Sequence, residues 1–193
     1  MEKVEFLPVL LASDINVYSM ARAFHEEYGI KSLVVARSSS NIIANSKILV
    51  YRERAGLDKT EVFLKEMNEI YKKYGKTKKL ILIGCADHYV RLIVENKAEL
   101  KDKFILPYTD KEVLDNIVLK ETFYELCEKY NLDYAKTFIY KPEMNFEFDL
   151  KDMLFPVVLK ASDSVKFHRN KFEGFHKAYF IDTKEELVDT LKL

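Results

Sequence analysis

The sequence has few of the residues that cross-link, kink or loosen a chain. Among its 193 residues are two cysteines, four prolines, five glycines and no tryptophan, and the 31 acidic residues balance 31 basic ones. Two cysteines are too few for the disulfide framework of a small secreted domain, and their separation does not fit a zinc knuckle. We therefore interpret Cys85 and Cys127 as buried, reduced thiols.

Other missing features exclude further classes of protein. No apolar run approaches the roughly 18 residues of a membrane span, and the first residues, MEKVEF, do not have the pattern of a signal peptide. The basic residues are not gathered into one long patch, which argues against a general nucleic-acid binder. We expect a soluble cytoplasmic protein with no membrane partner and no nucleic-acid partner.

The chain does have the apolar residues that a core needs. Hydrophobic residues make up 48% of it and aromatic residues 13%, which argues against disorder and suffices for one domain or for one domain and part of another. Residues 4–11 predict a buried parallel strand, residues 15–28 a helix and residues 32–35 a second strand, which together form a βαβ unit. Further strands are expected at 48–51, 80–85, 104–106, 136–140, 156–160 and 178–181, and further helices at 59–74, 89–96, 110–116 and 118–132 and after Thr183.

The turn after the first strand bears on whether the chain binds a dinucleotide. Ser13 or Asp14 is the expected N-cap of the first helix, and Gly29 its C-terminal stop. The turn itself contains no glycine, so the fingerprint of a dinucleotide-binding fold is absent. This argues against an NAD-dependent enzyme.

Polar residues follow two of the predicted strands, at the edge where open α/β sheets bind ligands. Residues 37–41 follow the second strand, and Asp87 and His88 follow the strand at 80–85. Asp87 has two interpretations, because it is either the N-cap of the next helix or a contact to a substrate. His88 has no second ligand at metal spacing, so we expect no metal site there.

The segment 155–177, FPVVLKASDSVKFHRNKFEGFHK, runs from an apolar strand into a basic, glycine-containing loop. The strand is expected to be buried and to end at Lys160. A basic loop at the end of a strand suits the binding of phosphate groups. An ordinary solvated surface loop gives the same pattern, so the residues alone leave both interpretations open.

This segment resembles the small lobe of the ATP-grasp fold, in which a Phe-Pro-x-x-x-Lys strand precedes a glycine loop. FPVVLKASDS, FEGFHKAYFI and LASDINVYSMARAFHEEYGIKS are similar to the D-aspartate ligase-like branch of the carboxylate–amine ligases. The resemblance covers essentially the whole chain and implies an α/β fold in two parts. These are a Rossmann-like pre-ATP-grasp domain with a parallel sheet at 1–118 and the incomplete first lobe of an ATP-grasp domain at 119–193.

The resemblance also implies which residues bind ATP. Lys120, at the start of a helix, and Lys160 match the family's pair of phosphate-binding lysines, and Ser162, Ser164 and Gly174 lie in the loop that closes over the phosphates. Without the resemblance, Lys120 is an ordinary solvated helix lysine.

On the substrate side, the resemblance points to Ser13, Asp14 and Asp87. Ala12 stands where the family usually has a glycine, which puts a tight substrate contact at this turn in question. The implied substrate is an amino acid or peptide such as D-aspartate, and because members of the family are often dimers, a homodimer is expected.

The implied reaction forms an amide-type bond from a carboxylate and an amine, at the expense of ATP and through an acyl phosphate. The family's Mg²⁺ ligands and its adenine contacts are expected downstream of Leu193, so this chain is expected to be the N-terminal part of a ligase and inactive by itself. The alternative is a non-catalytic Rossmann-like domain that binds a small metabolite.

Overall fold

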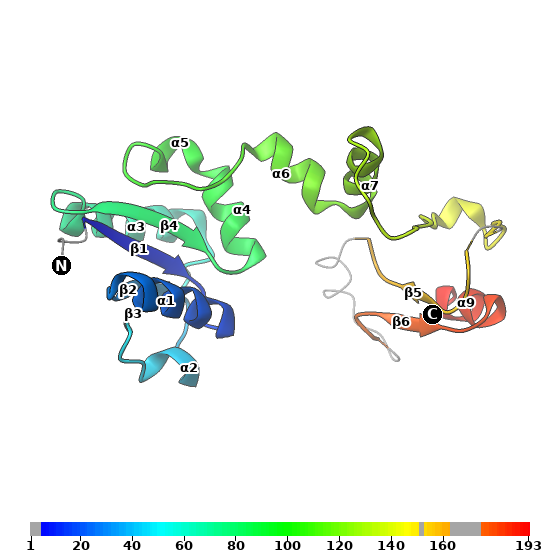
Figure 1. The fold of residues 1–193 in the computed structure, drawn as a ribbon, viewed down its shortest axis with the longest axis horizontal. Helices are drawn as coiled ribbons and strands as arrows, with labels where there is room; N and C mark the ends of the chain where they lie inside the picture. Colours follow the sequence, from blue (N-terminus) through cyan, green and yellow to red (C-terminus); the bar gives the residue numbers. More distant parts are fainter. Residues whose placement is uncertain (1–4, 151–152, 163–174) are drawn as a thin grey trace. The chain divides into compact units, whose positions relative to one another are not determined.

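The computed structural model describes residues 5–150, 153–162 and 175–193. The chain divides into two compact units, Met1–Lys111 and Glu112–Leu193, and each is described by itself (Figure 1). The sequence predicts a domain boundary after residue 118, between helices α6 (Lys111–Val118) and α7 (Lys120–Lys129). This predicted boundary lies a few residues after the division at Lys111.

The first unit is built on a four-stranded parallel sheet with the strand order β3-β2-β1-β4 (Figure 1). The predicted α/β class is therefore confirmed. The short strand predicted at 104–106 is reduced to a single parallel bridge between Ile81 and Ile105. The four strands are β1 (Phe6–Leu11), β2 (Ser32–Ala36), β3 (Leu49–Glu53) and β4 (Lys79–Gly84).

Helix α1 (Ile15–Tyr28) begins and ends where the sequence predicts. Asp14 is its N-cap, because one carboxylate oxygen accepts hydrogen bonds from the backbone amides of Asn16 at 3.1 Å and Val17 at 3.4 Å. Gly29 ends the helix with φ 63°, a left-handed conformation that glycine adopts without strain. The other helices of the unit are α2 (Asn41–Ala44), α3 (Thr60–Tyr74), α4 (Asp87–Glu95) and α5 (Lys97–Leu100).

The core of this unit lies around β1 and β2. All five residues of β2 are buried, as is the second half of β1. Helices α3 and α4 add apolar side chains to the same core, and each fully buried one contributes about 1.5–3 kcal/mol. Core residues from these elements include Leu10, Leu11, Val34, Phe63, Met67, Ile70 and Ile93.

A charged cluster fastens α3 to the edge strand β3. Glu66 of α3 is fully buried, and its carboxylate pairs with Arg52 at 2.6 Å and with Arg54. Glu69, one turn further along, accepts from both arginines at 2.7 Å. A buried carboxylate without such partners would cost several kcal/mol, so these contacts hold the helix in place.

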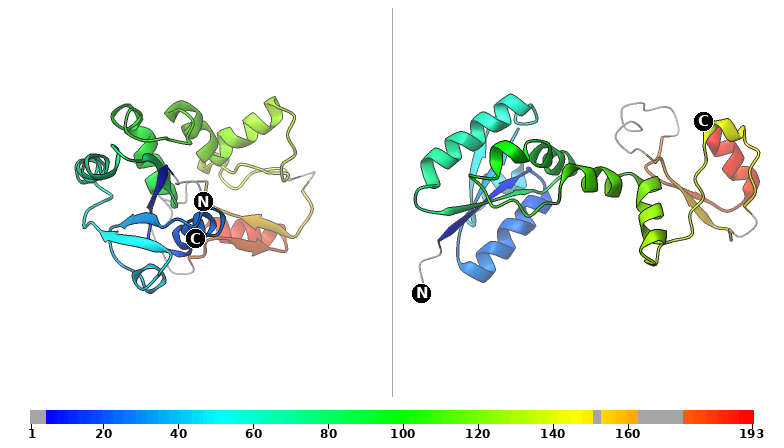
Figure 2. Two further views of the ribbon diagram at one scale, coloured as in Figure 1. Left: turned by 60° about the vertical axis from the view of Figure 1, so that its left-hand side comes forward. Right: turned by 90° about the horizontal axis from the view of Figure 1, so that it is seen from above.

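The second unit contains a two-stranded antiparallel sheet of β5 (Val157–Leu159) and β6 (Tyr179–Ile181), followed by α9 (Lys184–Leu191). Helix α9 begins after Thr183, as the sequence predicts, and Thr183 is its N-cap, since its Oγ1 accepts from the backbone amide of Glu186 at 3.2 Å. A short 3-10 helix, η1 (Pro142–Met144), lies between α7 and β5. Figure 2 shows α9 beside the two strands from both directions.

Two predictions for this unit are wrong. The strand expected at 136–140 does not form, because these residues do not pair with another strand and their aromatic rings instead pack on those of Phe146 and Phe148. Strand β5 is not buried, because Val158 on its outer face is 49% exposed. In the described part of the chain, no helix is both long and apolar enough to cross a membrane.

Candidate functional site

A cavity of about 940 Å³ in the second unit contains three of the residues predicted to contact ATP. Lys120, Lys160 and Ser162 all line it, although Lys120 is far from the other two in the sequence. Its walls come from the first turns of α7, from residues 135–140, from the stretch around β5 and from the end of α9. Ser164 and Gly174 lie outside the described residues, so their predicted contacts stay predictions.

Lys120 directs its ammonium group at the backbone that follows β5. Its Nζ donates a hydrogen bond to the carbonyl oxygen of Ala161 at 2.7 Å and approaches that of Ser162 at 3.4 Å. The lysine is half-buried at the first position of α7, where no side chain caps the helix. The ammonium group of Lys120 therefore links the start of α7 to the backbone that follows β5.

Lys160 comes directly after β5, and its side chain is exposed. Strand β5 pairs with β6 from Val157 opposite Ile181 to Leu159 opposite Tyr179, so the backbone before the lysine is held by sheet hydrogen bonds. Within the described ranges, no hydrogen bond or ion pair engages the Lys160 ammonium group. This lysine is available to an anionic ligand.

The remaining wall of the cavity is largely apolar and includes residues that the sequence analysis did not single out. Tyr124 lies one turn after Lys120 on α7, and its ring stacks on Tyr134 with centroids 5.2 Å apart and an interplanar angle of 28°. Glu121 pairs with Lys141 at 2.8 Å, and this hydrogen bond raises the pKa of Lys141. The helical spacing of Lys120 and Tyr124 was the available signal for Tyr124.

The cavity combines the ammonium groups of three lysines, Lys120, Lys136 and Lys160, with a wide apolar surface. Such a lining suits a ligand that has an anionic end and a planar, poorly solvated end. A magnesium site needs several oxygen ligands, usually with carboxylates among them. Among residues 5–150, 153–162 and 175–193, no group of three or more His, Cys, Asp or Glu side chains could hold a metal ion.

The predicted substrate-side residues lie at the carboxyl edge of the parallel sheet in the first unit. β1 and β4 are neighbours, with Leu11 opposite Gly84, so the residues that follow them emerge at the same edge. The carbonyl oxygen of Ser13 accepts a hydrogen bond from Ser40 Oγ. Asp14 uses its carboxylate as the cap of α1, with its second oxygen accepting from Asn16 Nδ2 at 3.1 Å.

The interpretation of Asp87 as an N-cap is wrong. Ala86 is the N-cap of α4, because its carbonyl accepts the first helical hydrogen bonds, from the amides of Tyr89 at 2.9 Å and Val90 at 3.1 Å. Asp87 is the first residue of the helix, and its side chain is exposed. A carboxylate there still interacts favourably with the positive end of the helix.

Cys85 sits at the same edge but is a poor nucleophile. Burial raises the pKa of its thiol to about 11, and the nearby charge of Asp14 adds to the effect. The thiol is therefore protonated at neutral pH. Cys127 of α7 is buried, as the sequence predicts, whereas Cys85 is only half-buried; both cysteines are free.

Gly84, at the end of β4, allows a close approach of strand and helix. A Cβ atom there would lie 2.7 Å from the backbone nitrogen of Val90 and 2.9 Å from the carbonyl carbon of Tyr89. The amide of Gly84 donates to the hydroxyl of Tyr108 at 2.8 Å, and burial raises the pKa of that hydroxyl. The edge between β1 and β4 is thus rigidly supported.

Comparison with known proteins adds a close relative. No family model matches the chain. Over 190 residues it is 42% identical to the D-aspartate ligase of Enterococcus faecium (strain Aus0004), and the match takes in 96% of this chain and 45% of that ligase. The chain thus spans less than half the length of this relative.

Two solved structures share the fold. The L-amino acid ligase from Bacillus licheniformis aligns with a TM-score of 0.58 at 11% identity, over 98% of this chain and 42% of its own. The ADP complex of PurK, an N5-carboxyaminoimidazole ribonucleotide synthetase, aligns with a TM-score of 0.58 at 14% identity, over 100% of this chain and 46% of its own. The α/β fold and the sequence match agree with the resemblance found in the sequence. The chain is thus a homologue of the N-terminal portion of D-aspartate ligase, and it shares the fold of the two solved ligase structures.

Proposed function

We propose that this chain is the N-terminal part of an ATP-dependent ligase, and that its second unit binds the phosphates of ATP. The observation that carries the proposal is that Lys120 and Lys160 line one cavity, with the Lys120 ammonium group 2.7 Å from the carbonyl oxygen of the residue after Lys160. In this proposal the first unit is the pre-ATP-grasp domain and contacts the substrate.

The lining of the cavity suits a nucleotide. The phosphates accept hydrogen bonds from Lys160 and from Lys120. When the phosphate binds, the Lys120 ammonium group leaves the carbonyl oxygen of Ala161 and donates to a phosphate oxygen instead. The apolar wall near Tyr124 covers the side of the nucleotide next to the phosphates. Mg²⁺ would supply further neutralisation of the phosphate charge, but the described residues do not form a site for it, and no step here depends on one.

The reaction transfers the γ-phosphoryl group and then an acyl group. An oxygen of the substrate carboxylate attacks the γ-phosphorus, the bond to the bridging oxygen breaks, and ADP leaves with that electron pair. The amine then attacks the acyl carbon, phosphate leaves, and the amine gives up a proton as the amide forms. The two lysines lower the barrier of the first step by compensating the charge on the phosphates.

The carboxylate substrate is proposed to be an amino acid of the D-aspartate class, on the strength of the relative's name. Ser13, Asp14 and Asp87 stay the candidates for contacting it. Asp87 is the freest of them, because it is exposed and Asp14 is already used as a helix cap. We also propose a cytoplasmic location, and that the 193-residue chain alone does not turn ATP over.

The Lys160→Ala variant tests this function. The substitution is made in the protein as its own cells produce it. ADP release is measured with ATP, Mg²⁺, D-aspartate and an amine acceptor, and the expected result is a loss of ten- to a hundredfold, the range for a hydrogen bond to a charged group. Lys129→Ala, on the exposed end of α7, is the control and should keep full activity.

Two results would contradict the proposal. Unchanged activity in Lys160→Ala, with an unchanged circular dichroism spectrum, would remove the lysine from the site, whereas the absence of ADP release in the parent protein would favour a metabolite-binding domain. Rapid magnesium-dependent ATP hydrolysis by the 193-residue chain alone would show that it is not an inactive part of a larger enzyme.

A further inference from the structure

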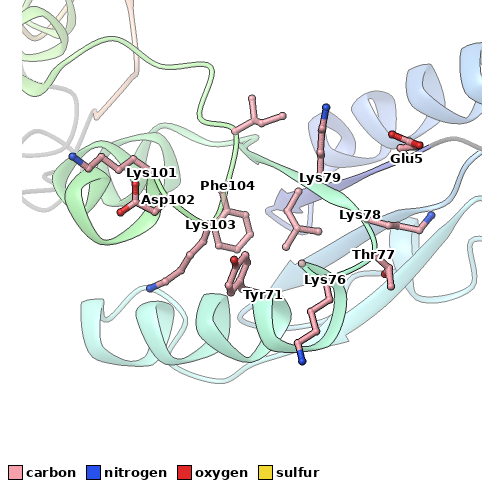
Figure 3. A pocket seen from close by; sticks show the side chains of 13 residues that line it. Glu5, Tyr71, Lys76, Thr77, Lys78, Lys79, Lys101, Asp102, Lys103 and Phe104 are labelled. Carbon is pink, nitrogen blue, oxygen red and sulfur yellow. The ribbon is translucent and has the colours of Figure 1, made fainter.

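A second cavity, of about 980 Å³, lies in the first unit at the edge where β1 and β4 begin. This is the edge opposite to the one that carries Ser13 and Asp87. Its walls come from the end of α3, the turn into β4, the turn after α5 and residue Glu5 (Figure 3). We call it the lysine pocket, because Lys76, Lys78, Lys79, Lys101 and Lys103 line it.

The charge of the lysine pocket is not balanced by ion pairs. Lys76, Lys78, Lys79 and Lys101 have no hydrogen bond or ion pair of their side chains within the described residues, and Lys103 donates only to the carbonyl of its own turn, at Glu99. The two carboxylates of the lining, from Glu5 and Asp102, are exposed. In a chain with no net charge, this concentrates positive potential at one place.

Lysines that follow a helix often serve to cap its last carbonyls, but here the backbone already does so. The carbonyl of Tyr71 accepts from the amide of Gly75 at 2.8 Å, and that of Tyr74 accepts from the amide of Lys78 at 3.0 Å. At the end of α5, the carbonyl of Leu100 accepts from the amide of Phe104 at 2.9 Å. Apart from Lys103, which donates to the carbonyl of Glu99 in α5, the lysine side chains therefore do not serve as caps.

The floor of the pocket is aromatic. Tyr71 and Phe104 pack with ring centroids 6.5 Å apart, and Tyr71 is 37% exposed. Gly75 makes room for this ring, because a Cβ atom there would lie 2.5 Å from Cδ2 of Tyr71. Ile105, 49% exposed, extends the apolar surface.

The directions of the lysines indicate the kind of ligand. Figure 3 shows Lys76, Lys79, Lys101 and Lys103 leaving the aromatic pair in different directions instead of converging on one point. A single small anion would reach few of them, whereas a ligand with several anionic groups would reach more. A cavity of about 980 Å³ is within the range of small-molecule sites.

We propose that the lysine pocket is a second binding site, distinct from the cavity of the second unit, for a ligand that carries two or more phosphate groups beside a planar ring. The phosphates lie among the lysines, and the ring lies against Tyr71 and Ile105. This site is independent of the proposed ATP site.

The test is a titration of the ¹⁵N-labelled 193-residue chain followed by NMR, with ADP and inorganic pyrophosphate as probes. The amides of residues 75–79 and 101–105 should shift saturably and less at high salt. ADP should bind about fivefold or more tightly than pyrophosphate, because ring stacking adds to the phosphate contacts. Shifts in β5 and β6 report separately on the site of the second unit, so the two proposals can fail independently.

Variants make the test specific. The double variant Lys76→Glu/Lys101→Glu should lose the shifts at 75–79 and 101–105, while Lys31→Glu/Lys47→Glu, at exposed lysines outside the pocket, should keep them. Tyr71→Ala should lose the preference for ADP, and Tyr71→Phe should retain it. The absence of saturable shifts, their persistence in Lys76→Glu/Lys101→Glu, or equal affinity for the two probes would overturn the proposal.

Discussion

Lys120 and Cys85 carry groups that can bind or react, and what each group can do depends on its surroundings. The Lys120 ammonium group is held at the carbonyls of Ala161 and Ser162, which places it in a cavity. The Cys85 thiol is enclosed near the carboxylate of Asp14, which favours the neutral form. The sequence identified both residues but not these surroundings, since each depends on a contact with a residue far away in the chain or across a turn.

Cys85 should react slowly with iodoacetamide at pH 7.5. The thiolate is the reactive form, and raising the pKa from 9.0 to about 11 lowers its population about 100-fold relative to the unfolded chain. The rate should rise as the pH approaches 11, and Asp14→Asn should raise it modestly by removing a negative charge. Peptide mapping by mass spectrometry separates Cys85 from Cys127. Equal rates for Cys85 in the native and the urea-unfolded chain would contradict this assignment.

At the scale of elements, local signals predicted the helices better than the short strands. Helix α1 has a capping aspartate, helical spacing of apolar residues and a terminal glycine, all of which act within the helix itself. The run at 136–140 has the composition of a strand but does not have a partner strand, and partners are a tertiary property. In the same way, order and spacing suggested Lys120 and Lys160, whereas the contribution of α9 to their cavity had no signal in the sequence.

Asp14→Ala should destabilise the first unit by about 1 kcal/mol, because two backbone amides at the start of α1 lose their acceptor. Asp14→Asn keeps an oxygen in that place and should cost little. Urea unfolding followed by circular dichroism measures both. If Asp14→Ala is as stable as the parent chain, the cap is not formed in solution.

Gly84→Ala should destabilise the first unit by about 1–3 kcal/mol, the usual cost of overpacking. The added methyl group would meet backbone atoms of α4, which cannot move aside as a flexible side chain can. Ala44→Gly, at an exposed end of α2, provides a comparison in which no packing is lost. If Gly84→Ala unfolds at the same temperature as the parent chain, β4 and α4 are not tightly packed at this position.

At the scale of the whole molecule, the two units separate two tasks. The first presents the carboxyl edge of a parallel sheet, and the second presents a cavity that includes Lys120 and Lys160. Because the units are separate, destabilising one should not affect the other. Gly84→Ala should therefore lower the unfolding temperature of the first unit and leave nucleotide binding by the second unit intact. Loss of that binding in a folded Gly84→Ala chain would mean that the units are coupled.

The central claim is that Lys120 and Lys160 bind the phosphates of ATP, and isothermal titration of ATP into the 193-residue chain tests it most directly. The titration is carried out in the Lys76→Glu/Lys101→Glu background, so that the lysine pocket does not contribute heat. Lys120→Met and Lys160→Met should each weaken ATP binding about tenfold or more, while Lys129→Met leaves it unchanged. A folded chain that does not bind ATP, or equal affinities in all three variants, would contradict the claim.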